Sequence, residues 1–132
     1  MTAVPTNPMM IVPTPPSQLK CNVLLLHAGA VVHRIHDKGL QAEQFNPGTR
    51  GNSRFAPITT PDGSRILTSY AATTFACAAF ETIFHDIDPD APFKSVPWTT
   101  IERLSYSTLE FGRDVRLCKM FSPDLMKWNC AR

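Results

Sequence analysis

The sequence lacks a long apolar run and a large excess of charge of either sign. No stretch approaches the roughly 18 apolar residues that a membrane-spanning helix needs, and the first residues lack the basic start and apolar stretch of a secretion signal. The 13 basic residues exceed the 11 acidic ones by too little to favour binding to a nucleic-acid backbone. These absences predict a cytoplasmic protein that binds neither membranes nor, by itself, nucleic acid.

Disulfides and metal sites are not predicted either. The four cysteines show no C-x-x-C spacing, and scattered cysteines in a reducing compartment are usually small buried hydrophobes. His33 and His36 lie in a strand-like segment, where an odd separation points them to opposite faces. Residues 86–97 begin like a calcium loop, but Ala91 and Pro97 replace the required glycine and glutamate. We therefore expect no metal and no prosthetic group. The cysteines are Cys21, Cys77, Cys118 and Cys130.

What is present is the composition of one folded domain. A chain of 132 residues, 43% apolar and 18% charged, can bury a single core. The five prolines between Met1 and Ser17 remove backbone donors and favour extended conformations. We interpret residues 1–21 as a proline-rich flexible leader and residues 22–132 as the domain.

Short strands and one clear helix are the predicted elements, which gives an α+β fold class. Apolar residues recur at helical spacing over 76–84, with Thr73 or Thr74 available as the cap. The turn residues of 61–64 predict a hairpin between strands 54–58 and 66–70. Ser122 followed by Pro123 predicts the start of a last helix, capped by the serine. The other predicted strands are 23–26, 31–35, 93–96, 101–109 and 115–120.

Two charged residues stand out for chemistry. Arg34 lies in an apolar strand-like run, where a guanidinium needs either a carboxylate partner or a phosphate to offset desolvation. With Phe80 at the centre of the helix's apolar stripe, Glu81 lies about 100° around the axis, at the rim of the buried face. Spacing alone favours a solvated Glu81. Arg50 and Arg54 flank a Gly-Asn-Ser segment that suits an anion.

In order and spacing, five segments between Leu26 and Leu117 together resemble the RES (Arg-Glu-Ser) domain family. They are His33-Arg34-Ile35-His36-Asp37-Lys38, Gln44-Phe45-Asn46-Pro47, Gly51-Asn52-Ser53-Arg54-Phe55-Ala56-Pro57, Ser69-Tyr70-Ala71-Ala72 and Ala79-Phe80-Glu81-Thr82. The resemblance implies a split mixed β-sheet with helices, similar to ADP-ribosyltransferases. It also implies an NAD-degrading toxin of a bacterial toxin-antitoxin system.

The resemblance assigns roles to individual residues. Arg34 matches the family's first-motif arginine, Tyr70 its tyrosine before the helix, and Glu81 its helical glutamate; Arg54 matches a further site arginine. Glu81 would then stabilise the cationic ribose, and Arg34 with Arg54 would hold the pyrophosphate or an attacking inorganic phosphate. Tyr70 would stack on nicotinamide. The implied partners are NAD and a cognate antitoxin protein.

One departure leaves the function open between three hypotheses. The family's serine lies on a later strand, and no residue here matches its context; Ser105 and Ser107 sit in a different setting. We therefore expect a domain truncated at its C-terminal end. The chain is either an enzyme cleaving the nicotinamide-ribose bond by phosphorolysis or hydrolysis, a protein ADP-ribosyltransferase, or a truncated non-catalytic binding module.

Overall fold

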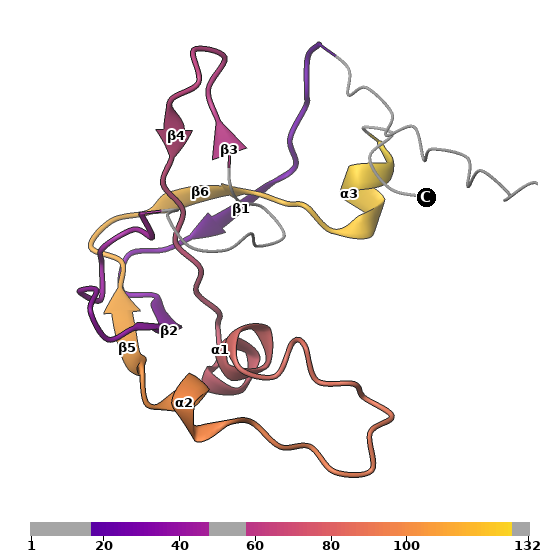
Figure 1. Ribbon diagram of the computed structural model, residues 1–132. Coiled ribbons are helices and arrows are strands. Elements are labelled where there is room, and N and C mark those ends of the chain that lie inside the picture. Colours follow the sequence, from indigo (N-terminus) through magenta and orange to yellow (C-terminus); the bar gives the residue numbers. More distant parts are fainter. Residues whose placement is uncertain (1–16, 48–57, 128–132) are drawn as a thin grey trace, which may run out of the picture. The chain divides into compact units, whose positions relative to one another are not determined.

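The computed structural model describes residues 17–47 and 58–127, and the chain divides into two compact units. The central unit comprises residues 28–113, and the terminal unit comprises residues 1–27 and 114–132. Figure 1 labels their helices and strands. The described part of the predicted leader, from Ser17, forms no helix or strand before residue 23.

The central unit is built on an antiparallel ladder of two strands. Strand β2 (Val31–Asp37) pairs with β5 (Leu104–Glu110), from Val31 opposite Glu110 to Asp37 opposite Leu104. Burial alternates along β2, with Val32, Arg34 and His36 buried and the residues between them more exposed. Burial that alternates every second residue is expected for a strand with one buried and one more exposed face. It confirms both the strand at 31–35 and the opposite orientations of His33 and His36.

One face of this ladder carries helix α1 (Phe75–Thr82). Thr74 is its N-cap and accepts a hydrogen bond from the backbone N–H of Cys77 at 3.1 Å, so the helix and its cap are confirmed. The helix buries Ala78 and Ala79, whereas Phe80 is 66% exposed. The expectation that Phe80 marks the centre of the buried face was wrong, because the helix lies close to the strands through its small residues.

The connection from α1 to β5 differs from the prediction. Residues 93–96 form no strand, and the short helix α2 (Trp98–Ile101) occupies the position where the strand 101–109 was expected to begin. Pro97 is the N-cap of α2 and makes no side-chain cap hydrogen bond; because proline has no backbone N–H, it leaves no donor without a partner at this position.

The predicted hairpin forms with shorter strands. Strands β3 (Ile58–Thr59) and β4 (Arg65–Ile66) pair antiparallel across the 61–64 turn, in which Gly63 has a φ of 86° that favours glycine. Residues 54–57 lie outside the described residues. Beyond β4, single bridges replace the expected strand to residue 70: Thr68 pairs with Asn46, and Ala72 pairs with His33.

The terminal unit consists of one ladder and one short helix. Strand β1 (Val23–Leu26) pairs antiparallel with β6 (Val115–Cys118), close to the predicted bounds of both strands. Helix α3 (Ser122–Met126) starts where expected, but its N-cap is Phe121 and not Ser122. Asn22 Nδ2 donates to Asp124 Oδ1 at 2.6 Å, which joins the helix to the segment before β1.

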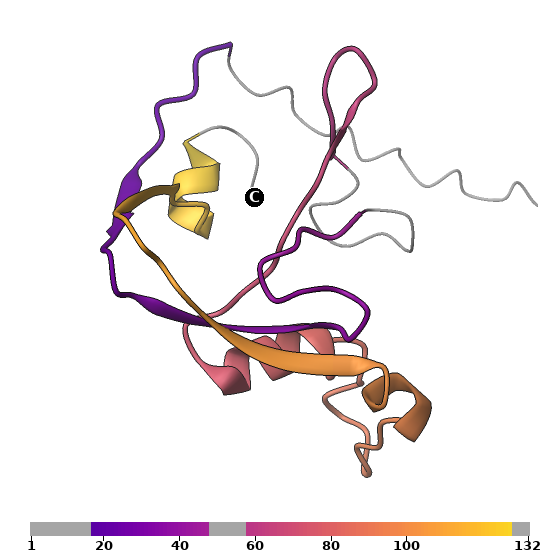
Figure 2. The same cartoon turned by 90° about the vertical axis from the view of Figure 1, so that its left-hand side faces the viewer.

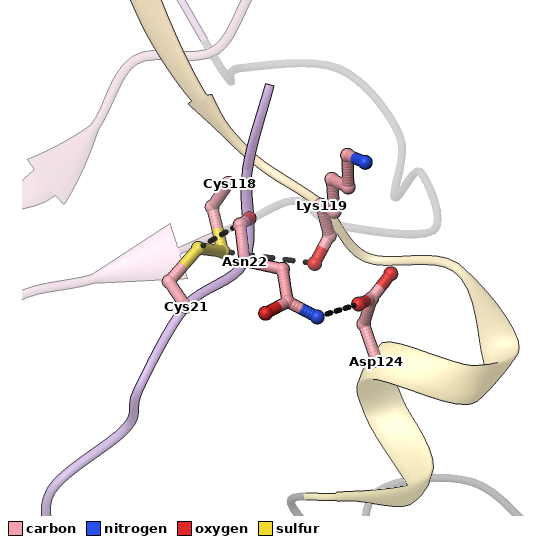
Figure 3. Close-up of a disulfide and its surroundings, with 5 residues drawn as sticks. All are labelled: Cys21, Asn22, Cys118, Lys119 and Asp124. Carbon is pink, nitrogen blue, oxygen red and sulfur yellow. Dashed lines mark hydrogen bonds between the residues drawn. A yellow bond between two sulfur atoms is a disulfide. The ribbon is translucent and has the colours of Figure 1, made fainter. Parts of the chain in front are cut away.

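A disulfide between Cys21 and Cys118 corrects the expectation that the cysteines are unpaired (Figure 3). Their Cα atoms lie 5.7 Å apart, within the range that a disulfide spans. The ladder causes this proximity, since Val23 lies opposite Cys118 and Cys21 is two residues before it. The two cysteines are 97 residues apart in sequence, so spacing gave no sign of the pairing. Cys77 is free and exposed.

The fold class is α+β, as predicted. The strands of residues 17–47 and 58–127 form three separate two-stranded ladders, all antiparallel, so a single mixed sheet is not present among them. The likeness to ADP-ribosyltransferases stays a prediction. None of the helices in this part of the chain has the length and apolar character to cross a membrane.

Candidate functional site

Arg34 lies at the centre of the candidate site. It occupies the middle of β2, and its side chain is 1% exposed. The guanidinium donates hydrogen bonds to the carbonyl oxygen of Ala42 and, at 3.2 Å, to Oδ1 of Asn46. Both acceptors belong to the loop of residues 38–47, which follows β2 and folds back over the buried face of the ladder. The loop thus covers Arg34.

The charge of Arg34 has only neutral partners in the described part of the chain. Its two acceptors are an amide and a backbone carbonyl, and no carboxylate of residues 17–47 or 58–127 forms an ion pair with it. Burial lowers the pKa of the Arg34 guanidinium, yet an arginine starts so high that it stays cationic at neutral pH. The buried ion pair weighed as an alternative is therefore not found here. A buried, uncompensated cation is suited to an anionic ligand.

Asn46 links Arg34 to the segment that carries Tyr70. While its side chain accepts from Arg34, its backbone N–H donates to the carbonyl oxygen of Thr68 at 2.7 Å. Further along, His33 and Ala72 exchange two backbone hydrogen bonds of 2.7 and 2.8 Å. Residues 68–72 therefore run beside β2, and they bring Tyr70, 39% exposed, close to the strand that holds Arg34.

Glu81 lies apart from this arrangement. It is exposed on α1, and α1 packs on the opposite face of the ladder: Phe75 makes an edge-to-face contact of 5.0 Å between ring centroids with Tyr106, which pairs with Ile35 and not with Arg34. Figure 2 shows loop 38–47 and α1 on the two sides of β2 and β5. The structure therefore does not bring Glu81 and Arg34 into one pocket. The catalytic role of Glu81 stays a prediction.

Arg34 lines neither of two shallow hollows in the described part of the central unit. One, of about 180 Å³, lies between the ladder and α1 and is lined by Ile35, Phe75 and Tyr106 among others. The other, of about 350 Å³, lies beside the end of α1 and the start of α2. Arg34, Tyr70 and Glu81 line neither hollow. The predicted anion site with Arg50 and Arg54 lies outside the described residues.

Sequence reasoning considered two polar side chains and gave them no role in the site, yet both lie on the face of Arg34. His36 is 7% exposed, and its Nε2 lies 2.9 Å from Oγ of Ser107 on β5. Ser107 is the residue directly opposite Arg34 in the register. Strand alternation offered a partial signal, because it places positions 34 and 36 on one face. The identity of the opposing residue depends on the register, which the sequence does not reveal.

Comparison with known proteins identifies one family. The model of the RES domain matches residues 31–129, which begin at the first residue of β2 and include the segments around Arg34, Tyr70 and Glu81. No curated protein and no solved structure matches the chain. Strand β1 and Cys21 lie before the matched residues.

Proposed function

The chain belongs to the RES domain family, and we propose on that premise that it consumes NAD by breaking the bond between nicotinamide and ribose. The observation that supports this proposal is the buried Arg34 cation, whose hydrogen-bond partners among the described residues are a backbone carbonyl and an amide. The pyrophosphate of NAD supplies the anion that such a guanidinium favours, and Arg binds phosphate oxygens in a fork-like geometry. We take the attacking group to be inorganic phosphate or water.

In the proposed reaction, a carboxylate of the protein lies beside the ribose that carries nicotinamide, and guanidinium groups hold the pyrophosphate. Departure of neutral nicotinamide leaves positive charge on the ribose ring, which a nearby carboxylate stabilises; we assign this role to Glu81. Tyr70 stacks on the nicotinamide ring, and Arg54 assists Arg34 with the pyrophosphate or the attacking phosphate. In this proposal the protein acts as the toxin of a toxin-antitoxin pair, and its partner is a protein antitoxin.

Binding without catalysis is the second candidate, and one observation favours it. Arg34 bonds to loop 38–47 on one face of the β2–β5 ladder, whereas Glu81 belongs to α1, which packs on the other face, so the two charges that cleavage requires do not face one another. A binding module retains the cationic Arg34 but releases no nicotinamide. Turnover by the purified chain would exclude this candidate.

Release of nicotinamide from NAD tests the proposed function. The purified chain, free of any inhibitor protein, is incubated with NAD in the presence and absence of inorganic phosphate, and the products are separated chromatographically. We expect nicotinamide in amounts that grow with time, together with ADP-ribose or its phosphorylated form, which distinguishes water from phosphate as the attacking group. A folded sample that releases none contradicts the proposal. NAD label attached covalently to another macromolecule, with little free ADP-ribose, would indicate a protein ADP-ribosyltransferase.

A further inference from the structure

The hydrogen bonds of His36 fix which of its ring nitrogens carries the proton. Nδ1 lies 2.9 Å from the backbone carbonyl oxygen of Asp37, and Nε2 lies 2.9 Å from Oγ of Ser107. A carbonyl oxygen only accepts hydrogen bonds, so in the neutral ring the proton is on Nδ1. Nε2 is then the acceptor, and the Ser107 hydroxyl donates to it.

This order of groups is the one that activates a serine. A ring nitrogen accepts the hydroxyl hydrogen bond, and a second group holds the ring in the tautomer that makes this possible. Here the orienting group is the carbonyl of Asp37 in place of a carboxylate. His36 is 7% exposed and Ser107 is half-buried, so water competes little for the bond.

The register places the activated hydroxyl beside the proposed anion site. Ser107 lies opposite Arg34, and residues paired in this way have Cβ atoms about 4.5–5.5 Å apart. In NAD, the ribose carbon that bears nicotinamide is only a few bonds from the pyrophosphate. A pyrophosphate bound at Arg34 therefore brings that carbon to the side of the ladder where Ser107 lies.

We propose that Ser107 is an acceptor of the ADP-ribosyl group on this chain, with His36 as the acceptor of its proton; the inference rests on the proposed function. Ser107 Oγ forms a bond to the ribose carbon while the bond to nicotinamide breaks. Nicotinamide leaves as a neutral molecule with the electron pair of that bond, and the serine proton passes to Nε2 of His36. The product is an O-linked ADP-ribosylserine, and the step needs no oxidant or reductant.

Mass spectrometry of the chain after incubation with NAD tests the proposal. We expect one ADP-ribosyl group on Ser107, absent from Ser107→Ala. Ser105→Ala is the matched control, because Ser105 lies on the same strand opposite His36 and has no side-chain hydrogen bond to it. His36→Gln keeps an acceptor but removes the base, so the rate of modification should fall about a hundredfold. Circular dichroism of each variant establishes that it is folded.

A second readout does not depend on NAD. A small sulfonyl fluoride should react with Ser107 in the unaltered chain and in Ser105→Ala, and His36→Gln should abolish the reaction. Nicotinamide release with an unmodified Ser107 overturns this inference and leaves the proposed function intact. A chain that releases no nicotinamide overturns both the proposed function and the role of Ser107 as an ADP-ribosyl acceptor. In that case, reaction of Ser107 with the sulfonyl fluoride supports only the activation of Ser107 by His36.

Discussion

Arg34 is buried, and removing its charge from water costs free energy. The loop that covers it offsets only part of this desolvation cost. Neutral acceptors satisfy two of the guanidinium's donors, whereas an ion in a protein interior carries a desolvation penalty on the order of several kcal/mol. Apolar side chains could fill the same position of β2 without this penalty. The burial of Arg34 therefore adds little stability, which agrees with the proposed binding of an anionic ligand.

Glu81 is the second single residue whose proposed role can be tested. Glu81→Gln removes the negative charge but keeps the shape, so nicotinamide release should fall by about two to three powers of ten if the carboxylate acts in the transition state. The free energy of unfolding should change by less than about 0.5 kcal/mol, because Glu81 is exposed. Glu102→Gln, at the exposed C-cap of α2, is the control. Undiminished release by Glu81→Gln would remove this residue from the reaction.

Among the elements, α1 depends on its cap. Thr74 satisfies the N–H of Cys77, which the helix itself leaves without a partner. Thr74→Ala should therefore lower the free energy of unfolding by about 1 kcal/mol. Thr73→Ala is the matched control, since Thr73 lies one residue before the cap, and its effect in urea denaturation should be close to zero. Equal effects of the two substitutions would show that the cap bond contributes nothing.

The carboxylate of Asp62 accepts hydrogen bonds within the turn of the β3–β4 hairpin. Hydrogen bonds from the Thr60 hydroxyl, and then from the backbone and hydroxyl of Ser64, lower the Asp62 pKa. Because the folded pKa is lowered, the bonds stabilise the hairpin above the pKa of an unfolded aspartate, and this contribution is lost as the pH falls through the folded pKa. Carboxyl NMR titration should show the lowered pKa, and Thr60→Val should raise it. An unchanged pKa in Thr60→Val would contradict this account; Thr59→Val is the control.

Local patterns predicted those elements whose signals lie within a few residues. The helix with its threonine cap, strand β1 and the turn of the hairpin all depend on local spacing and turn residues. Contacts between residues that are distant in the sequence were not predictable. Residues 67–70 were expected to extend a strand, yet one isolated bridge, between Thr68 and Asn46, forms there instead, because the partner is a loop residue distant in sequence. The Arg34–Ser107 register and the Cys21–Cys118 bond depend on such pairings too.

In the candidate site too, local features were predictable, but the relative positions of residues distant in sequence were not. Strand alternation and the apolar neighbours of Arg34 predicted a guanidinium in need of a partner, and its burial agrees. The position of Glu81 relative to Arg34 could not be derived, because helical spacing says which residues share a face of α1 but not which face of the ladder the helix covers. The contact of Phe75 with Tyr106 shows which face the helix covers.

At the scale of the whole chain, the disulfide fastens the two ends of the terminal unit. Strands β1 and β6 are four residues long with mostly exposed side chains, and an isolated two-stranded pair is marginally stable in water. A bond that closes a loop of about 100 residues contributes up to about 4.7 kcal/mol. Replacing Cys21 and Cys118 together by serine should thus cost about 2–5 kcal/mol in urea denaturation.

The free cysteine offers the control for this prediction. Cys77→Ser removes an exposed thiol that is not in a disulfide, so it should leave the unfolding curve unchanged. A reducing agent should destabilise the unaltered chain as much as the double substitution does, and should have no effect on the double variant. Equal stability of oxidised and reduced chains would show that the bond does not hold the unit together.

The central claim is that the buried cation of Arg34 binds the pyrophosphate of NAD. Calorimetric titration of NAD into the unaltered chain and Arg34→Met tests it, with Arg116→Met on exposed β6 as the control. We predict that Arg34→Met binds NAD on the order of 10–100-fold more weakly, as expected for loss of charged hydrogen bonds, while the control binds normally. Equal affinity of a folded Arg34→Met and the unaltered chain would contradict the account.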